Sequence, residues 1–124
     1  MRSTAIVAQL HQLLAIASAL LVLVVGLEAS WRAVHRSLPG LHVAQLQGLL
    51  TIVLVVAAAG GLGLLVGGAR PRELLHFVYG VIAIGAVPVA DSLTRQADPR
   101  PRAIATLIGA LVSLVVILRL FGTG

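Results

Sequence analysis

Four long runs of apolar residues, separated by short polar breaks, constrain the fold of this chain more than any other feature. They cover residues 5–27, 41–69, 74–90 and 103–121. A helix needs about 20 mainly apolar residues to cross the hydrocarbon core of a bilayer, and each run is long enough to do so. Runs of this length and continuity predict transmembrane helices. The sequence therefore predicts one all-α domain, 1–124, that is an integral membrane bundle of four transmembrane helices.

Composition supports contact with the lipid bilayer. The chain is 59% hydrophobic and 10% charged, whereas soluble domains carry about 25% charged residues. The net charge of +5 comes from arginines in short clusters between the apolar runs. That placement suits lipid headgroups and does not make the continuous basic face of a nucleic-acid-binding protein. The absence of cysteine excludes disulfides, thiolate metal sites and iron–sulfur clusters.

The polar breaks predict the topology. We expect a linker at residues 28–40, closed by the turn signal Pro39-Gly40, and a stiff solvated loop at 91–102. The break at 67–72 is so short that the second and third runs must be antiparallel neighbours. Pro88 should kink the third helix or end it early. Four spans give an up-down-up-down order with both termini on the same side.

Arginine counts give only a slight orientation. Four arginines fall on the side that holds the termini and five on the opposite side. By the positive-inside rule, this difference slightly favours an orientation with the opposite side in the cytoplasm and the termini outside. Arginine without lysine, among so much alanine, leucine and glycine, fits a GC-rich genome, and we expect a bacterial or archaeal cell membrane.

A stripe of small residues in the second run predicts a helix-packing face. Ala59, Gly63 and Gly67 recur every four residues, and membrane helices approach one another through small residues. The spacing does not tell whether the neighbour is another helix of this chain, a second copy or a subunit of another protein.

Two histidines lie within the apolar runs on the side that holds the termini. His11 lies about 9 Å into the first run and His76 about one turn into the third, at 1.5 Å per residue. These two runs point in the same direction, and Arg119, near the end of the fourth run, comes to the same side. Tilt would have to absorb the difference in depth between the histidines, which is about one turn.

Two neutral imidazoles on facing helices are a ligand set for a six-coordinate b-type haem. In that hypothesis His11 and His76 bind the iron, Arg119 meets a propionate, Tyr79 donates a hydrogen bond and Gly80 leaves room for the porphyrin. The layout of four short spans with histidines near the helix ends resembles small b-type membrane cytochromes, in architecture rather than in a motif.

Each of these residues also has a plainer interpretation. A histidine near a helix end can bind water, headgroups or a backbone carbonyl, and an arginine there can reach the interface. On the opposite side, His35 and His42 could form a metal site with Glu28 and Asp91, but no spacing is diagnostic. We expect those two carboxylates to pair with nearby arginines instead, namely Arg32, Arg36 or Arg95. The role of His35 and His42 stays open.

Two functions fit these residues. The first is a non-catalytic accessory or scaffold subunit of a larger membrane complex, respiratory or otherwise engaged in electron transfer. The alternative is a bis-histidine b-type haem protein that carries electrons to or from a quinone or a protein partner. Catalysis by this chain alone is not expected, because its loops are short and no enzyme motif is present.

Overall fold

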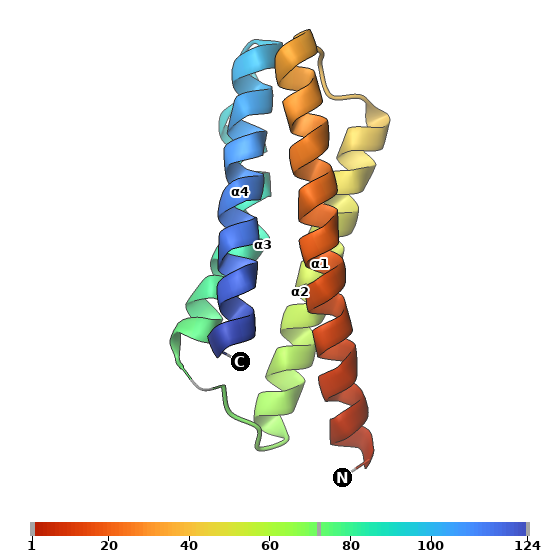
Figure 1. Cartoon of the computed structure of the whole chain (residues 1–124), viewed down its shortest axis with the longest axis vertical. Coiled ribbons are helices and arrows are strands. Elements are labelled where there is room, and N and C mark those ends of the chain that lie inside the picture. Colours follow the sequence, from red (N-terminus) through yellow and green to blue (C-terminus); the bar gives the residue numbers. More distant parts are fainter. Residues whose placement is uncertain (1, 72, 124) are drawn as a thin grey trace.

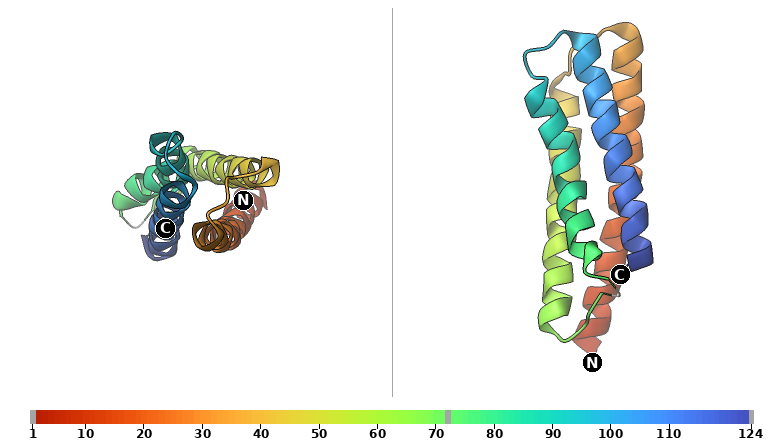
Figure 2. Two further views of the ribbon diagram at one scale, coloured as in Figure 1. Left: turned by 90° about the horizontal axis from the view of Figure 1, so that it is seen from above. Right: turned by 90° about the vertical axis from the view of Figure 1, so that its left-hand side faces the viewer.

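The computed structural model describes residues 2–71 and 73–123. Within these ranges the chain forms four helices: α1 (Arg2–His35), α2 (Leu41–Val66), α3 (Leu75–Leu93) and α4 (Pro99–Thr123). The helices stand side by side, up-down-up-down, and both ends of the chain lie at the same end of the bundle (Figures 1 and 2). Each is long and apolar enough to cross a membrane. The prediction of a four-helix transmembrane bundle is confirmed, and the chain is an integral membrane protein.

Helix α1 extends well beyond the predicted first span. It comprises 34 residues, which at 1.5 Å per residue is about 50 Å and exceeds the roughly 30 Å of a hydrocarbon core. The expected linker is therefore helical up to His35. Charge alone did not end the helix, because Glu28 and Arg32 form an ion pair one turn apart and no glycine or proline intervenes. The helix ends where Arg36 adopts a positive φ of 51°.

Pro88, before the third polar break, and Pro99, within it, behave differently from each other. Helix α3 continues past Pro88 to Leu93, so Pro88 does not end the helix. Helix α4 begins at Pro99, where the missing N–H costs nothing because the first turn has no partner for it. The predicted loop at 91–102 is consequently reduced to residues 94–98.

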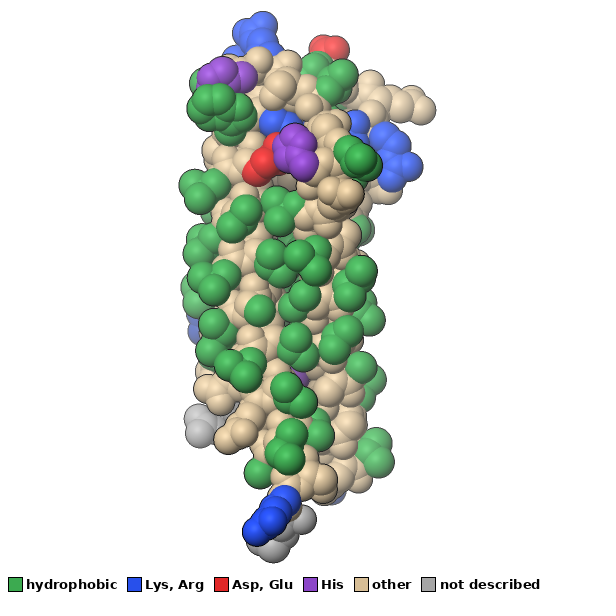
Figure 3. All heavy atoms as spheres, turned by 90° about the vertical axis from the view of Figure 1, so that its right-hand side faces the viewer, with side chains coloured by type: hydrophobic (Ala, Val, Ile, Leu, Met, Phe, Trp, Pro, Cys, Tyr) green, Lys and Arg blue, Asp and Glu red, His purple; other side chains and the backbone are tan. Residues whose placement is uncertain are grey.

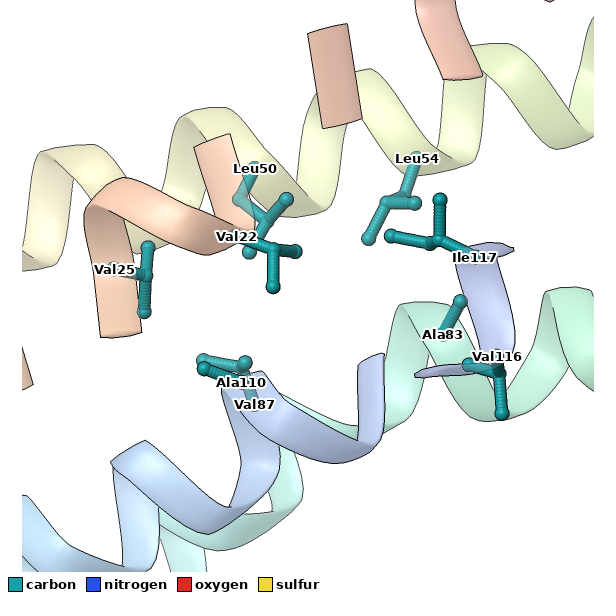
Figure 4. Close-up of a cluster of buried hydrophobic side chains, with 9 residues drawn as sticks. All are labelled: Val22, Val25, Leu50, Leu54, Ala83, Val87, Ala110, Val116 and Ile117. Carbon is teal, nitrogen blue, oxygen red and sulfur yellow. The ribbon is translucent and has the colours of Figure 1, made fainter. Parts of the chain in front are cut away.

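A small core lies between the four helices near the middle of the bundle (Figure 4). It consists of nine buried side chains: Val22, Val25, Leu50, Leu54, Ala83, Val87, Ala110, Val116 and Ile117. Most other large apolar side chains point outward, and Figure 3 shows them along the length of one face, with charged groups at its two ends. This distribution is expected where lipid, rather than protein, covers the helices.

Helix α4 makes the closest contacts in the bundle. A Cβ on Gly109 would lie 2.8 Å from the carbonyl oxygen of Ala86, so the backbones of α3 and α4 touch there. One turn further along α4, the Ser113 hydroxyl donates to the carbonyl oxygen of Ala83 at 3.0 Å. Helix α4 also packs along α1, and α1 along α2, whereas α2 and α3 have the fewest contacts of the four neighbouring pairs.

Candidate functional site

His11 of α1 and His76 of α3 come together near the end of the bundle that holds the termini. Their ring centroids are 6.3 Å apart, and the ring planes are inclined at 49°. Both residues are half-buried. The sequence placed these histidines on the same side of the membrane, and the tertiary structure brings them within reach of a common ligand.

The two histidines reach the same level because α3 begins further along the bundle than α1. His76 is the second residue of α3, which begins at Leu75, whereas His11 lies more than two turns into α1, which begins at Arg2. Figure 1 shows that α3 begins higher in the bundle than the lower ends of α1 and α2. His11 and His76 therefore lie at the same depth because α3 is short and starts further from that end of the bundle.

The ring of His11 is fixed against the backbone of α2. Its Nδ1 lies 2.8 Å from the carbonyl oxygen of Ala57, and because a carbonyl oxygen only accepts, Nδ1 carries the proton. A Cβ on Gly61 would lie 3.2 Å from Cε1 of the ring, and one on Gly60 would lie 3.9 Å from Nδ1. In the neutral form of His11, the lone pair therefore lies on Nε2.

His76 is held in the same tautomer by a weaker contact. Its Nδ1 lies 3.3 Å from Oγ1 of Thr123. The Thr123 hydroxyl donates its own proton to the carbonyl oxygen of Arg119 at 3.2 Å, so Oγ1 accepts from Nδ1 of His76. The neutral form of this tautomer carries its lone pair on Nε2, and the backbone of Leu120 also lies within hydrogen-bond reach of the ring.

The other predicted site residues take different positions. Tyr79 is half-buried against the central core. Gly80 lies one turn from His76, and a Cβ there would meet no atom within 4 Å, so this part of α3 faces open space. The side chain of Arg119 is exposed, and only its backbone carbonyl takes part in the contacts around His76.

Ala57, Gly60, Gly61 and Thr123 were missed by the sequence analysis. The adjacent glycines, in a segment rich in alanine and glycine, were the only available signal, since such residues let another group approach the backbone of α2. The contacts of Ala57 and Thr123 left no signal, because any residue has a carbonyl and threonine is common near helix ends.

The donor set fits a haem iron better than a metal ion held by protein alone. Among the described residues there is no cluster of three or more histidine, cysteine or acidic side chains, and zinc sites need three or four such ligands. A porphyrin supplies four ligands, so two imidazoles complete the coordination. Ring nitrogens about 2 Å from a shared metal place the ring centroids on the order of 6 Å apart, which is the separation of His11 and His76.

The structure does not bring Glu28, His35, His42 and Asp91, the residues considered as a metal site on the opposite side, together into one cluster. The two acids form ion pairs with arginines. Glu28 pairs with Arg32, as expected, whereas Asp91 pairs with Arg102 at 2.9 Å and not with Arg95. His35 stacks on Trp31, with ring centroids 3.7 Å apart, and His42 is exposed. Within residues 2–71 and 73–123 these side chains form no metal cluster.

Most of the small-residue stripe of α2 points away from the rest of the bundle, but a Cβ on Gly67 would lie 3.6 Å from Cγ2 of Thr4 in α1. Ala59, Gly63 and Gly67 are exposed. A Cβ on Gly63 would meet no atom within 4 Å. The stripe therefore takes little part in packing within the chain and is free to face lipid or another protein.

Comparison with protein-family models, with curated proteins and with solved structures found no match. The class defined by the fold is a small polytopic membrane protein. A narrower function has to be argued from the histidine pair and from the exposed faces of the helices.

Proposed function

We propose that this protein is a small membrane cytochrome that binds a b-type haem between His11 and His76. The observation that carries the proposal is the separation of the two ring centroids, 6.3 Å. Surface histidines at helix ends have no reason to meet at this distance across two helices. Two neutral imidazoles with their lone pairs on Nε2 have the chemistry that an iron porphyrin requires.

The residues around the histidines would orient the ligands and set their basicity. Metal-binding histidines usually donate their second ring N–H to a carbonyl or another acceptor, which fixes the tautomer and the ring orientation. Ala57 supplies such an acceptor to His11, and Thr123 supplies one to His76. The bound haem supplies a one-electron couple. The apolar helices would keep water from the ligands and hold the site within electron-transfer reach of a quinone or a protein partner.

An absorption spectrum tests this proposal directly. The chain would be expressed with ample haem, purified in detergent, and measured oxidised and then reduced with dithionite. We expect the sharp α-band of a reduced six-coordinate haem in the wild type, lost in His11→Ala and in His76→Ala. His35→Ala and His42→Ala change exposed histidines at the other end and should leave the band intact. A featureless wild-type spectrum would contradict the proposal.

A second candidate, an accessory subunit of a larger membrane complex, is favoured by the exposed face at Ala59, Gly63 and Gly67. Small residues that are unused within the chain allow a second helix to approach closely. This role is compatible with haem binding, since electron carriers in membranes work beside partner subunits.

Cysteine cross-linking tests the accessory role. The chain has no cysteine, so Gly63→Cys introduces a unique thiol on the stripe. We expect a benzophenone maleimide attached to this thiol to link the variant, on irradiation in native membranes, to one partner in high yield. Leu62→Cys, an exposed neighbour on a different face of α2, should not cross-link. Equal cross-linking of both variants would argue against a partner on the stripe.

A further inference from the structure

Arg32 is an unusual buried group at the end of the bundle opposite the histidine pair. The residue is only 2% exposed. Its Nε donates to both carboxylate oxygens of Glu28, at 2.7 and 2.9 Å. The terminal nitrogens, Nη1 and Nη2, are buried and have no hydrogen-bond partner within residues 2–71 and 73–123. The N–H groups of these two nitrogens lack acceptors, although buried polar groups in proteins are nearly always paired.

A third buried donor without a partner is on α2. It is the amide nitrogen Nε2 of Gln47. Because His11 contacts Ala57 and the two helices are antiparallel, Glu28 of α1 is level with the start of α2, about two turns before Gln47. Side chains in a helix lean toward its N-terminus. The amide of Gln47 therefore extends toward the start of α2, in the direction of the contact between Arg32 and Glu28.

Both side chains belong to the inward faces of their helices. Arg32 continues the buried row of Val22, Val25 and Ala29 on α1. Gln47 lies one turn from Val43 and close to Leu50, which are buried residues of α2. The donors of Arg32 and Gln47 therefore point into the interior at one end of the bundle, where lipid tails offer no acceptor.

The chemistry of these donors selects an oxyanion. All three unpaired atoms are donors, so the complementary group has several acceptor oxygens and no need to donate. Because Nε of Arg32 already donates to Glu28, its Nη1 and Nη2 atoms remain as donors. Two such donors side by side can bind two oxygens of a phosphoryl group. This end of the bundle also carries more positive than negative residues: Arg32, Arg36, Arg95, Arg100 and Arg102 against Glu28, Asp91 and Asp98. A net positive end attracts anionic headgroups.

We propose that Arg32 and Gln47 form a binding site for a phosphoryl oxyanion, supplied either by an anionic phospholipid of the adjacent leaflet or by free phosphate. Protein atoms cover both Nη atoms in the structure, so the oxygens reach them when a covering side chain moves aside. Binding would then satisfy the donors that the chain leaves unpaired. The site is independent of the histidine pair.

Two measurements test the site and identify the source of the phosphate. Native mass spectrometry in detergent measures retention of phosphatidylglycerol, and thermal unfolding with added inorganic phosphate measures stabilisation by the free ion. Arg32→Lys keeps a positive charge beside Glu28 but removes the Nη edge. Gln47→Leu removes the third donor and leaves the ion pair intact. Arg95→Lys, at an exposed arginine of the same end, is the control.

We expect Arg32→Lys and Gln47→Leu to retain phosphatidylglycerol roughly tenfold less well than the wild type, the scale of one lost charge-assisted hydrogen bond. Arg95→Lys should match the wild type. Stabilisation by inorganic phosphate that depends on Arg32 would support the site with the free ion as its ligand. Equal binding by wild type, Arg32→Lys and Gln47→Leu, or no binding by the wild type, would overturn the proposal. If Arg32→Lys does not fold, Gln47→Leu decides by the same criteria.

Discussion

Gly61 of α2 lies directly against the imidazole of His11, so that a Cβ added there would be 3.2 Å from Cε1 of the ring. The contact explains why the ring reaches the carbonyl of Ala57. It also makes the glycine, rather than the histidine alone, a determinant of the site.

A larger side chain at this position should therefore displace His11. We expect Gly61→Leu to lower the free energy of unfolding in detergent by about 1–3 kcal/mol, the usual cost of overpacking, and to weaken any cofactor band. Gly63→Leu, two residues away in open space, is the control for thermal unfolding and for the spectrum. Equal effects of both variants would mean that the contact with His11 is not important.

The backbone contact between α3 and α4 at Gly109 predicts a second overpacking effect. Gly109→Ala places a methyl group 2.8 Å from the carbonyl of Ala86, and backbone cannot move aside as a side chain can. We expect a loss of about 1–3 kcal/mol. Gly48→Ala, where a Cβ meets nothing within 4 Å, should be neutral or stabilising. Unfolding in detergent followed by circular dichroism would compare the two variants, and an unchanged Gly109→Ala would contradict the packing of α3 against α4.

The Ser113 hydroxyl is expected to contribute modestly to the packing of the same helix pair. Ser113→Ala removes its bond to the carbonyl of Ala83, and hydrogen bonds between membrane helices are worth about 0.6 kcal/mol on average. Ser30→Ala is the matched control, because Ser30 bonds only within its own helix, to Gly26. Chemical unfolding curves for the two variants should differ by this amount, with Ser113→Ala the less stable.

Glu28 should be more important for stability than its partial exposure suggests. Glu28→Gln removes the only carboxylate that Arg32 contacts among the described residues, and an uncompensated buried charge costs about 3–5 kcal/mol. Asp98→Asn changes an exposed acid at the same end and should be nearly neutral. Thermal unfolding of the two variants measures the difference. A Glu28→Gln protein as stable as the wild type would show that Arg32 is satisfied in another way.

The sequence by itself determined the class of this protein and its topology. Long apolar runs must be helical in lipid, because the backbone has no other partner there, and four such runs leave both termini on one side. It did not determine where the helices end. Helix α1 continues to His35 because Glu28 and Arg32, one turn apart, form an ion pair. Helix α4 begins at Pro99, which fits the first turn of a helix.

Only the tertiary structure decided which polar residues meet. The apolar pattern placed His11 and His76 on the same side, but their contact depends on where α3 begins and on the glycines that admit the ring of His11 to α2. The unpaired donors of Arg32 and Gln47, and the outward direction of Gly63, were likewise invisible in the sequence. The physical reason is that hydropathy specifies depth in the membrane, whereas lateral contacts between helices depend on side-chain shape and helix rotation.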